Sequence, residues 1–386
     1  MHLYSLFRKH WAIISVLIIT LAGLFIRLYQ LTWQCYNVDE VYTAQVAANT
    51  TQSIIYYSFR YDCNLPLYYI IVHWVSVFAG TIDRFTVRIP AVISGTLCIP
   101  IVYLIGKQIR NETLGLLAAS AVSIMFPFFL YSQDGRAYTL VMLMFLCFVY
   151  FYIKIAEGDK SSKTIIIAGL FAALALWSHY YAIVPIGIAI ILLILNNRKL
   201  PALEVSVIIG ILVSPMLFLM DIHNLLSRAA PGIFGTSYAL GTTSPTLTIS
   251  PLQMMLYLPF ELWCWTCMVI IPLAIYSLWK YKLKIFGYFT WIGIGSIIGV
   301  VILSCFTNTM PRYALLVSPL FIIMALYPVA EIIQDKKLPE QMISLFLLAI
   351  FVIFLINYPS ILSWVSFNIC PVVNGTYQLL PPGGTY

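Results

Sequence analysis

Two adjacent acids, Asp39 and Glu40, are the residues of this sequence best suited to catalysis. They come shortly after the first long apolar segment, which ends near residue 30. A carboxylate at a membrane boundary can act as a general base, bind a metal ion or cap the first turn of a helix. We expect Asp39 to cap a helix that begins at Glu40 or Val41, and this role is compatible with catalysis.

Arginines stand beside polar groups at three further places. Asp134, Arg136 and Tyr138 share one short segment, while Arg88 and Arg312 each precede an apolar segment. A guanidinium group offers a planar pair of donors that matches a phosphate or a carboxylate. The pattern therefore fits an anion-binding site, although an ion pair between Asp134 and Arg136 that only closes the turn would explain part of it.

His179 and Tyr180 lie at the junction of two apolar segments, where a histidine more often forms a structural hydrogen bond than acts as a catalyst. The sequence has no glycine-rich phosphate loop, no Asp-X-Asp pair and no Cys/His cluster with zinc spacing. We therefore expect no metal and no cofactor, although the acidic pair leaves a divalent ion possible. Carboxylates together with arginines suit the transfer of a group from a phosphate-linked donor.

The elements that position these residues must be membrane helices. Of the 386 residues 61% are apolar and 9% are charged, whereas soluble domains carry about 25% charged residues. A segment of roughly 20 apolar residues spans a bilayer as a helix. We therefore predict an all-α polytopic membrane protein, one domain over residues 1–386, with eleven spans at about 11–30, 88–106, 113–131, 137–154, 164–180, 181–197, 203–221, 257–279, 285–306, 313–333 and 341–358.

A further apolar segment, 65–80, is only 16 residues long, and the positive-inside rule places it on the outer surface. With that arrangement all 11 lysines face the cytoplasm, the N-terminus is cytoplasmic, and the basic residues at the outer face are all arginines. The net charge of +7 is then topogenic and does not indicate nucleic-acid binding. Three outer segments could build a site: 32–87, 222–256 and 359–386.

Five motifs occur in an order typical of one family over residues 10–315. They are the acidic pair, the segment 64–69 (NLPLYY), the segment 88–90 (RIP), the turn 132–138 (SQDGRAY) and the pair Arg312-Tyr313. With them the chain resembles the GT-C glycosyltransferases of the protein O-mannosyltransferase and lipid A aminoarabinose transferase type. The resemblance implies a GT-C bundle with outer juxtamembrane helices, in the cell membrane.

The resemblance also implies an activity: transfer of a sugar from a polyprenyl phosphate (dolichyl or undecaprenyl) on the non-cytoplasmic face, with inversion. Asp39 matches the acid that activates the acceptor, Glu40 its companion, and Arg88 a functionally important arginine. We assign the donor phosphate to Arg88, Arg136 and Arg312. The expected substrate-binding residues are Asn64, Tyr68, Asp134, Tyr138, His179 and Tyr180.

Two departures from the family affect the acceptor, which can be a glycan, a lipid or a protein hydroxyl. The family often has His-Pro-Pro where this chain has Asn64-Leu65-Pro66. A large C-terminal soluble domain found in many relatives is also absent from the sequence, so a glycan or lipid acceptor is expected ahead of a protein. The competing functions are a transporter or lipid flippase, which predicts charges along a path through the bilayer, and a non-catalytic assembly subunit.

Overall fold

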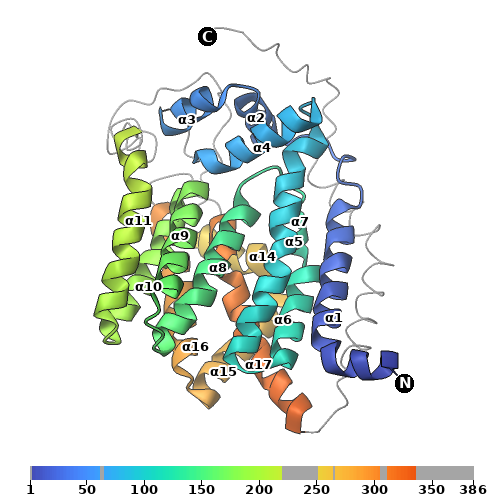
Figure 1. Ribbon diagram of the computed structural model, residues 1–386, viewed down its shortest axis with the longest axis vertical. Helices are drawn as coiled ribbons and strands as arrows, with labels where there is room; N and C mark the ends of the chain where they lie inside the picture. The colour runs from blue at the N-terminus through green and yellow to red at the C-terminus, as the bar shows by residue number, and fades with distance from the viewer. Residues whose placement is uncertain (1, 61–64, 220–250, 264–265, 305–310, 336–386) are drawn as a thin grey trace.

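Long, nearly parallel helices form a bundle, and three short helices lie across one of its ends (Figure 1). The computed structural model describes residues 2–60, 65–219, 251–263, 266–304 and 311–335, and the described residues contain helices but no strand. The N-terminus lies at the end of the bundle opposite the three short helices. These three are α2 (Val38–Ala47), α3 (Thr51–Arg60) and α4 (Pro66–Ala79).

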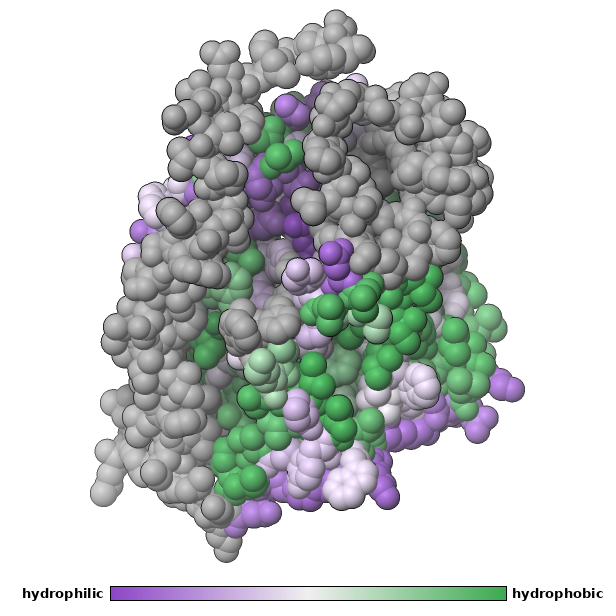
Figure 2. Space-filling model, turned by 180° about the vertical axis from the view of Figure 1, so that it is seen from behind, coloured by the Kyte–Doolittle hydropathy of each residue, from purple (hydrophilic) through white to green (hydrophobic). Residues whose placement is uncertain are grey.

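Apolar composition makes the bundle a membrane structure. Six described helices are long and apolar enough to cross a bilayer, and five further apolar helices are shorter. Large apolar side chains face outward along them, and in Figure 2 they form a broad area between a polar lower edge and a polar group near the top. The helices of the bundle are α1 (His2–Leu28), α5 (Arg84–Ile109), α6 (Glu112–Ile124), α7 (Phe126–Leu130), α8 (Tyr138–Glu157), α9 (Ser162–Ser178), α10 (Ile183–Leu195), α11 (Lys199–Leu219), α14 (Pro251–Trp263), α15 (Cys267–Tyr281), α16 (Lys284–Ser304) and α17 (Ser318–Asp335).

Ten of the eleven predicted spans coincide with helices of this bundle, and the eleventh, 341–358, lies outside the described residues. The count of eleven is not confirmed. The predicted span 257–279 is divided between α14 and α15, and the span 113–131 is broken between α6 and α7. Segment 65–80 forms α4, which lies with α2 and α3 across the end of the bundle, as expected for a juxtamembrane helix.

The break between α6 and α7 follows from Pro127, which has no backbone N–H to bond the carbonyl of Ser123 one turn earlier. Arg27, fully buried at the end of α1, donates instead to the carbonyls of Ser123 and Val122, each at 3.1 Å. Its Nε also donates to Ser132 Oγ at 3.0 Å. A buried arginine thus fixes the break, and with it the start of the 131–137 turn.

Close packing holds α5 against its neighbours. A Cβ added at Gly106 would lie 2.8 Å from Gly115 Cα of α6, so the two backbones touch where both residues are glycine. The buried core continues from α5 and α6 into α8 and α9. As a result the first turn of α8 and the last turn of α9 are rigidly placed at the end of the bundle that α2, α3 and α4 cover.

Candidate active site

Helix α2 carries the acidic pair, and Asn37 is its cap. The Asn37 side-chain oxygen accepts from Glu40 N at 2.8 Å, and the Glu40 carboxylate accepts from Asn37 N at 3.1 Å. This is a capping box, which satisfies two otherwise unpaired N–H groups of the first turn. The prediction that Asp39 caps the helix is wrong: the helix begins at Val38, and Asn37 with an acid three residues later is the sequence signal that identifies the cap.

Glu40 is turned inward, where four donors surround its carboxylate. Its side chain pairs with Arg88 through Nε at 2.6 Å and Nη2 at 2.7 Å. Gly135 N donates to it at 2.8 Å, in addition to the bond from Asn37 N. Only 1% of Glu40 is exposed, so the carboxylate holds α2 against α5 and the 131–137 turn and does not face a substrate.

Arg88, on α5, likewise holds neighbouring segments of the chain together. Its Nη groups also donate to the backbone carbonyls of Leu31 (2.6 Å), Gln34 (3.1 Å) and Cys35 (2.9 Å). Together with the two bonds to Glu40 these use all five N–H donors of the guanidinium, which is 3% exposed. The expectation that Arg88 binds the donor phosphate therefore needs correction, because in this structure it has no donor left for a ligand.

Asp39 points the other way, toward Arg312. The Asp39 carboxylate lies 3.0 Å from Arg312 Nη2, and 42% of the Asp39 side chain and 25% of the Arg312 side chain are exposed. Arg312 lies at the start of the 3₁₀ helix η3 (Pro311–Val317), 273 residues along the chain from Asp39. The guanidinium carbon is 5.2 Å from the centre of the Tyr138 ring, a cation–π contact at the first turn of α8.

Arg136 stands beside this pair. Its Nη1 lies 3.3 Å from each of three acceptors, the Asp39 carbonyl, Thr43 Oγ1 and the Tyr69 hydroxyl. The buried guanidinium therefore joins the 131–137 turn to α2 and α4. Its positive charge lies close to the Asp39–Arg312 pair, so two guanidinium groups stand beside one accessible carboxylate.

Asp134 completes the polar group. Its carboxylate accepts from Asn37 Nδ2 at 3.2 Å. The pKa of Asp134 is raised to about 6, mainly by burial and then by the charge of Glu40, and this is the net value after the opposite effects of Arg312 and Arg136. The Asp134 carboxyl, at the edge of the site, therefore changes charge near neutral pH.

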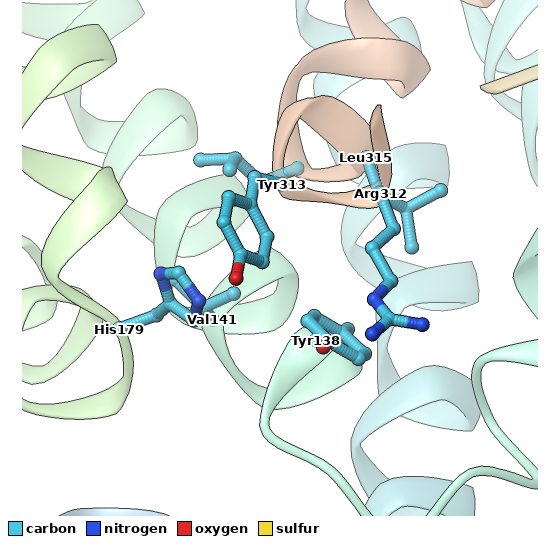
Figure 3. A pocket seen from close by; sticks show the side chains of 7 residues that line it. Tyr138, Val141, His179, Arg312, Tyr313 and Leu315 are labelled. Carbon is cyan, nitrogen blue, oxygen red and sulfur yellow. The ribbon is translucent and has the colours of Figure 1, made fainter. Parts of the chain in front are cut away.

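A narrow pocket adjoins Arg312 (Figure 3). Tyr138 and Tyr313 form its aromatic walls and His179 its far side, and its apolar lining residues are Val141, Leu315 and Leu316. His179 follows the last residue of α9 and stacks on Tyr180 with ring centres 4.8 Å apart. Of the residues predicted from the sequence, Tyr138, His179 and Arg312 thus line one pocket.

The other predicted substrate residues lie differently. The Tyr68 hydroxyl is buried and donates to the Val87 carbonyl at 2.9 Å, so it connects α4 to α5 and is not available to a substrate. Tyr180, in the 3₁₀ helix η1 (Tyr180–Ala182), stacks on His179 and is not among the residues that line the pocket. Asn64 lies outside the described residues.

Sequence reasoning missed Thr43, Tyr69 and Tyr313. Thr43 lies one turn after Asp39, a spacing that would have placed it on the same helix face. Tyr69 is the neighbour of Tyr68, and nothing in the sequence tells which of the two reaches an arginine. Tyr313 follows Arg312 directly and forms the pocket wall opposite Tyr138.

The expectation that the protein uses no metal ion stays a prediction. Among those residues no group of three His, Cys, Asp or Glu side chains is placed to hold a metal ion. Glu40 and Asp39 also face away from each other, toward Arg88 and Arg312 respectively.

Solved structures share this fold. ArnT from Cupriavidus metallidurans bound to undecaprenyl phosphate superposes with a TM-score of 0.57 at 13% identity, over 83% of this chain and 60% of that one. The oligosaccharyltransferase AglB from Archaeoglobus fulgidus, in complex with an inhibitory peptide and a dolichol-phosphate, gives 0.60 at 14% identity, over 91% of this chain and 55% of that one. The chain therefore has the fold of these membrane proteins.

In sequence, residues 66–219 match the family described as dolichyl-phosphate-mannose-protein mannosyltransferase. No curated protein matches the chain in sequence. The chain spans about three fifths or less of the length of the solved structures it resembles.

Proposed function

We propose that the protein is a glycosyltransferase that moves a sugar from a polyprenyl-phosphate donor to a hydroxyl group of a glycan, a lipid or a protein. The observation that carries the proposal is the contact between Asp39 and Arg312. It brings an accessible carboxylate and an accessible guanidinium together, next to Arg136 and at the mouth of a pocket. A base and a phosphate-binding cation side by side are what this transfer needs.

In the proposed step the acceptor oxygen attacks the anomeric carbon while the bond from that carbon to the phosphate oxygen breaks. The bonding pair leaves with the phosphate, and the proton of the acceptor hydroxyl moves to the Asp39 carboxylate. A single displacement of this kind inverts the anomeric centre. Arg312, with Arg136 beside it, stabilises the charge that grows on the leaving phosphate.

Arg88 and Glu40 take part as positioning residues. Their buried pair fixes the first turn of α2, and therefore the position of Asp39, relative to α5 and the 131–137 turn. In this structure Arg312 pairs with Asp39. A donor phosphate that binds Arg312 competes with this pairing and frees the carboxylate for the acceptor.

The similar structures support the donor class, because one is bound to undecaprenyl phosphate and another is in complex with a dolichol-phosphate and a peptide. The polar residues described above also gather at one end of the bundle, whereas a transporter or flippase would need them along the membrane path. The positive-inside pattern of the sequence supports a non-cytoplasmic location for that end.

The test is to supply purified protein with dolichyl or undecaprenyl phosphate carrying mannose, glucose or 4-amino-4-deoxyarabinose, together with membrane glycans, lipids and peptides as acceptors. We expect release of lipid phosphate and a glycoside of inverted configuration, detected by mass spectrometry and NMR. Movement of labelled lipid across proteoliposomes without any new glycosidic bond would contradict the proposal in favour of a flippase.

A further inference from the structure

His179 carries a polar atom that the contacts described so far do not explain. Its Nε2 is buried and has no hydrogen-bond partner among residues 2–60, 65–219, 251–263, 266–304 and 311–335, and the residue as a whole is 2% exposed. The ring lines the pocket beside Arg312 (Figure 3). Leaving a buried donor or acceptor unpaired typically costs about 1–3 kcal/mol, so a ligand atom that pairs with it gains that energy.

The other nitrogen of the ring shows what Nε2 offers. His179 Nδ1 accepts a hydrogen bond from Tyr181 N at 3.2 Å. A nitrogen that accepts carries no proton, so in the neutral ring the proton lies on Nε2, which is then a donor. Stacking on Tyr180 at 4.8 Å and contact with Tyr313 at 4.9 Å hold the ring in place.

The two ends of the pocket differ in charge. At one end the Nε of Arg312 is a second buried N–H without a partner in the described residues, and the guanidinium is paired with Asp39. At the other end His179 presents a neutral donor between aromatic and apolar walls. A charged end suits a phosphate oxygen, whereas a neutral donor beside tyrosine rings suits a sugar hydroxyl.

We propose that His179 Nε2–H donates a hydrogen bond to a hydroxyl of the sugar carried by the lipid-phosphate donor, with Tyr138 and Tyr313 as the walls against the sugar. The assignment rests on the proposed function. It makes His179 the residue that recognises the sugar, while Arg312 binds the phosphate. The pocket is narrower than a water molecule in this structure, so its aromatic walls must move apart to receive one edge of the sugar ring.

Two substitutions separate this role from the role of His179 in the fold. Asn in His179→Asn retains an acceptor for Tyr181 N near the Nδ1 position but does not reach the position of Nε2. Gln in His179→Gln carries an amide N–H close to the position of Nε2. We expect thermal unfolding of His179→Asn to match the wild type, and His179→Gln to restore ligand binding in part.

Binding is measured for bare dolichyl phosphate and for dolichyl phosphate carrying mannose, glucose or 4-amino-4-deoxyarabinose. We expect His179→Asn to weaken binding of the best sugar-bearing lipid by about tenfold, the value of one hydrogen bond. Binding of bare dolichyl phosphate should stay within about twofold of the wild type. Equal effects on both lipids, or no effect on either, would overturn the proposal.

A sugar hydroxyl can also belong to the acceptor, and a kinetic comparison decides between the two sources. We expect His179→Asn to raise the KM for the donor and to leave the KM for the acceptor unchanged. The opposite result would assign the pocket to the acceptor and contradict the proposal. A wild-type protein that binds these lipids but never transfers the sugar would instead refute the glycosyltransferase function and leave the binding comparison for His179 intact.

Discussion

At the scale of single residues, the site depends on which acid and which arginine remain accessible. Glu40 and Arg88 form a buried ion pair with each other. Asp39 and Arg312 also form an ion pair, but a ligand can open it because both side chains are partly exposed. The sequence identified all four residues. The sequence does not show which of the four remain accessible to a ligand. The number of backbone carbonyls around Arg88, for example, is set by the path of residues 31–35 and not by any motif.

Arg88→Lys tests the assignment of Arg88 as a positioning residue. Lysine keeps the charge but cannot make five fixed hydrogen bonds, and weakening a buried ion pair destabilises strongly, by up to about 3–5 kcal/mol when one partner is lost. We expect a lower melting temperature and a lower kcat, with the affinity for bare dolichyl phosphate unchanged.

Glu112→Gln is the matched control, because it breaks an exposed ion pair with Lys107 at the opposite end of the bundle. It should leave stability and turnover close to wild type. If Arg88→Lys weakened phosphate binding without lowering the melting temperature, Arg88 would be a phosphate ligand after all.

Asp134 predicts a pH dependence of donor binding. Its raised pKa, about 6, means that the carboxyl is neutral below that pH and negative above it. A phosphodiester donor keeps one negative charge throughout, so repulsion grows as the pH rises from 5 to 7.5, and its Kd should increase by about fivefold, roughly 1 kcal/mol. Asp134→Asn should remove this change; an unaltered pH profile in that variant would refute the prediction.

At the scale of elements, α2 is the piece that brings catalytic groups to the bundle. The apolar pattern of the sequence located the membrane helices well, because each contains a long uniform stretch. It located α2 less well: ten residues of mixed polarity give a weak periodic signal, and the cap was predicted at Asp39, although the structure has it at Asn37. The choice between Tyr68 and Tyr69 depends on how α4 is rotated, which the sequence does not encode locally.

Asn37→Ala tests whether the cap positions α2. Loss of an N-cap costs about 1 kcal/mol, and α2 would then hold Asp39 less firmly. We expect a lower melting temperature and reduced turnover relative to Asn37→Ser, which retains a capping oxygen. Equal stability of the two variants in thermal unfolding would show that the cap contributes nothing measurable.

At the scale of the whole molecule, the charge pattern of the loops predicts which side of the membrane each end of the bundle faces. Alternating lysine-rich and arginine-containing connections predicted which helix ends meet, and Asp39, Arg136 and Arg312, all assigned to the outer face, lie together at one end of the bundle. The number of spans was harder to predict, because proline breaks such as the one at Pro127 interrupt a helix without changing its hydropathy.

Membrane orientation can be measured by labelling single cysteines in a cysteine-free background. Ala48→Cys lies exposed after α2, and Lys160→Cys lies exposed in the connection between α8 and α9 at the other end. A membrane-impermeant maleimide should label Ala48→Cys in intact cells and Lys160→Cys only after permeabilisation. The reverse pattern would place the site on the cytoplasmic side.

The central claim is that Asp39 and Arg312 serve one reaction, the first as base and the second as phosphate ligand. The most direct test is Asp39→Asn, with turnover of the sugar-bearing lipid and binding of bare dolichyl phosphate measured on the same preparation. We predict that turnover falls by about 10²-fold or more while binding tightens by about threefold, because Arg312 loses its internal partner. Normal turnover, or binding that weakens together with turnover, would contradict the claim.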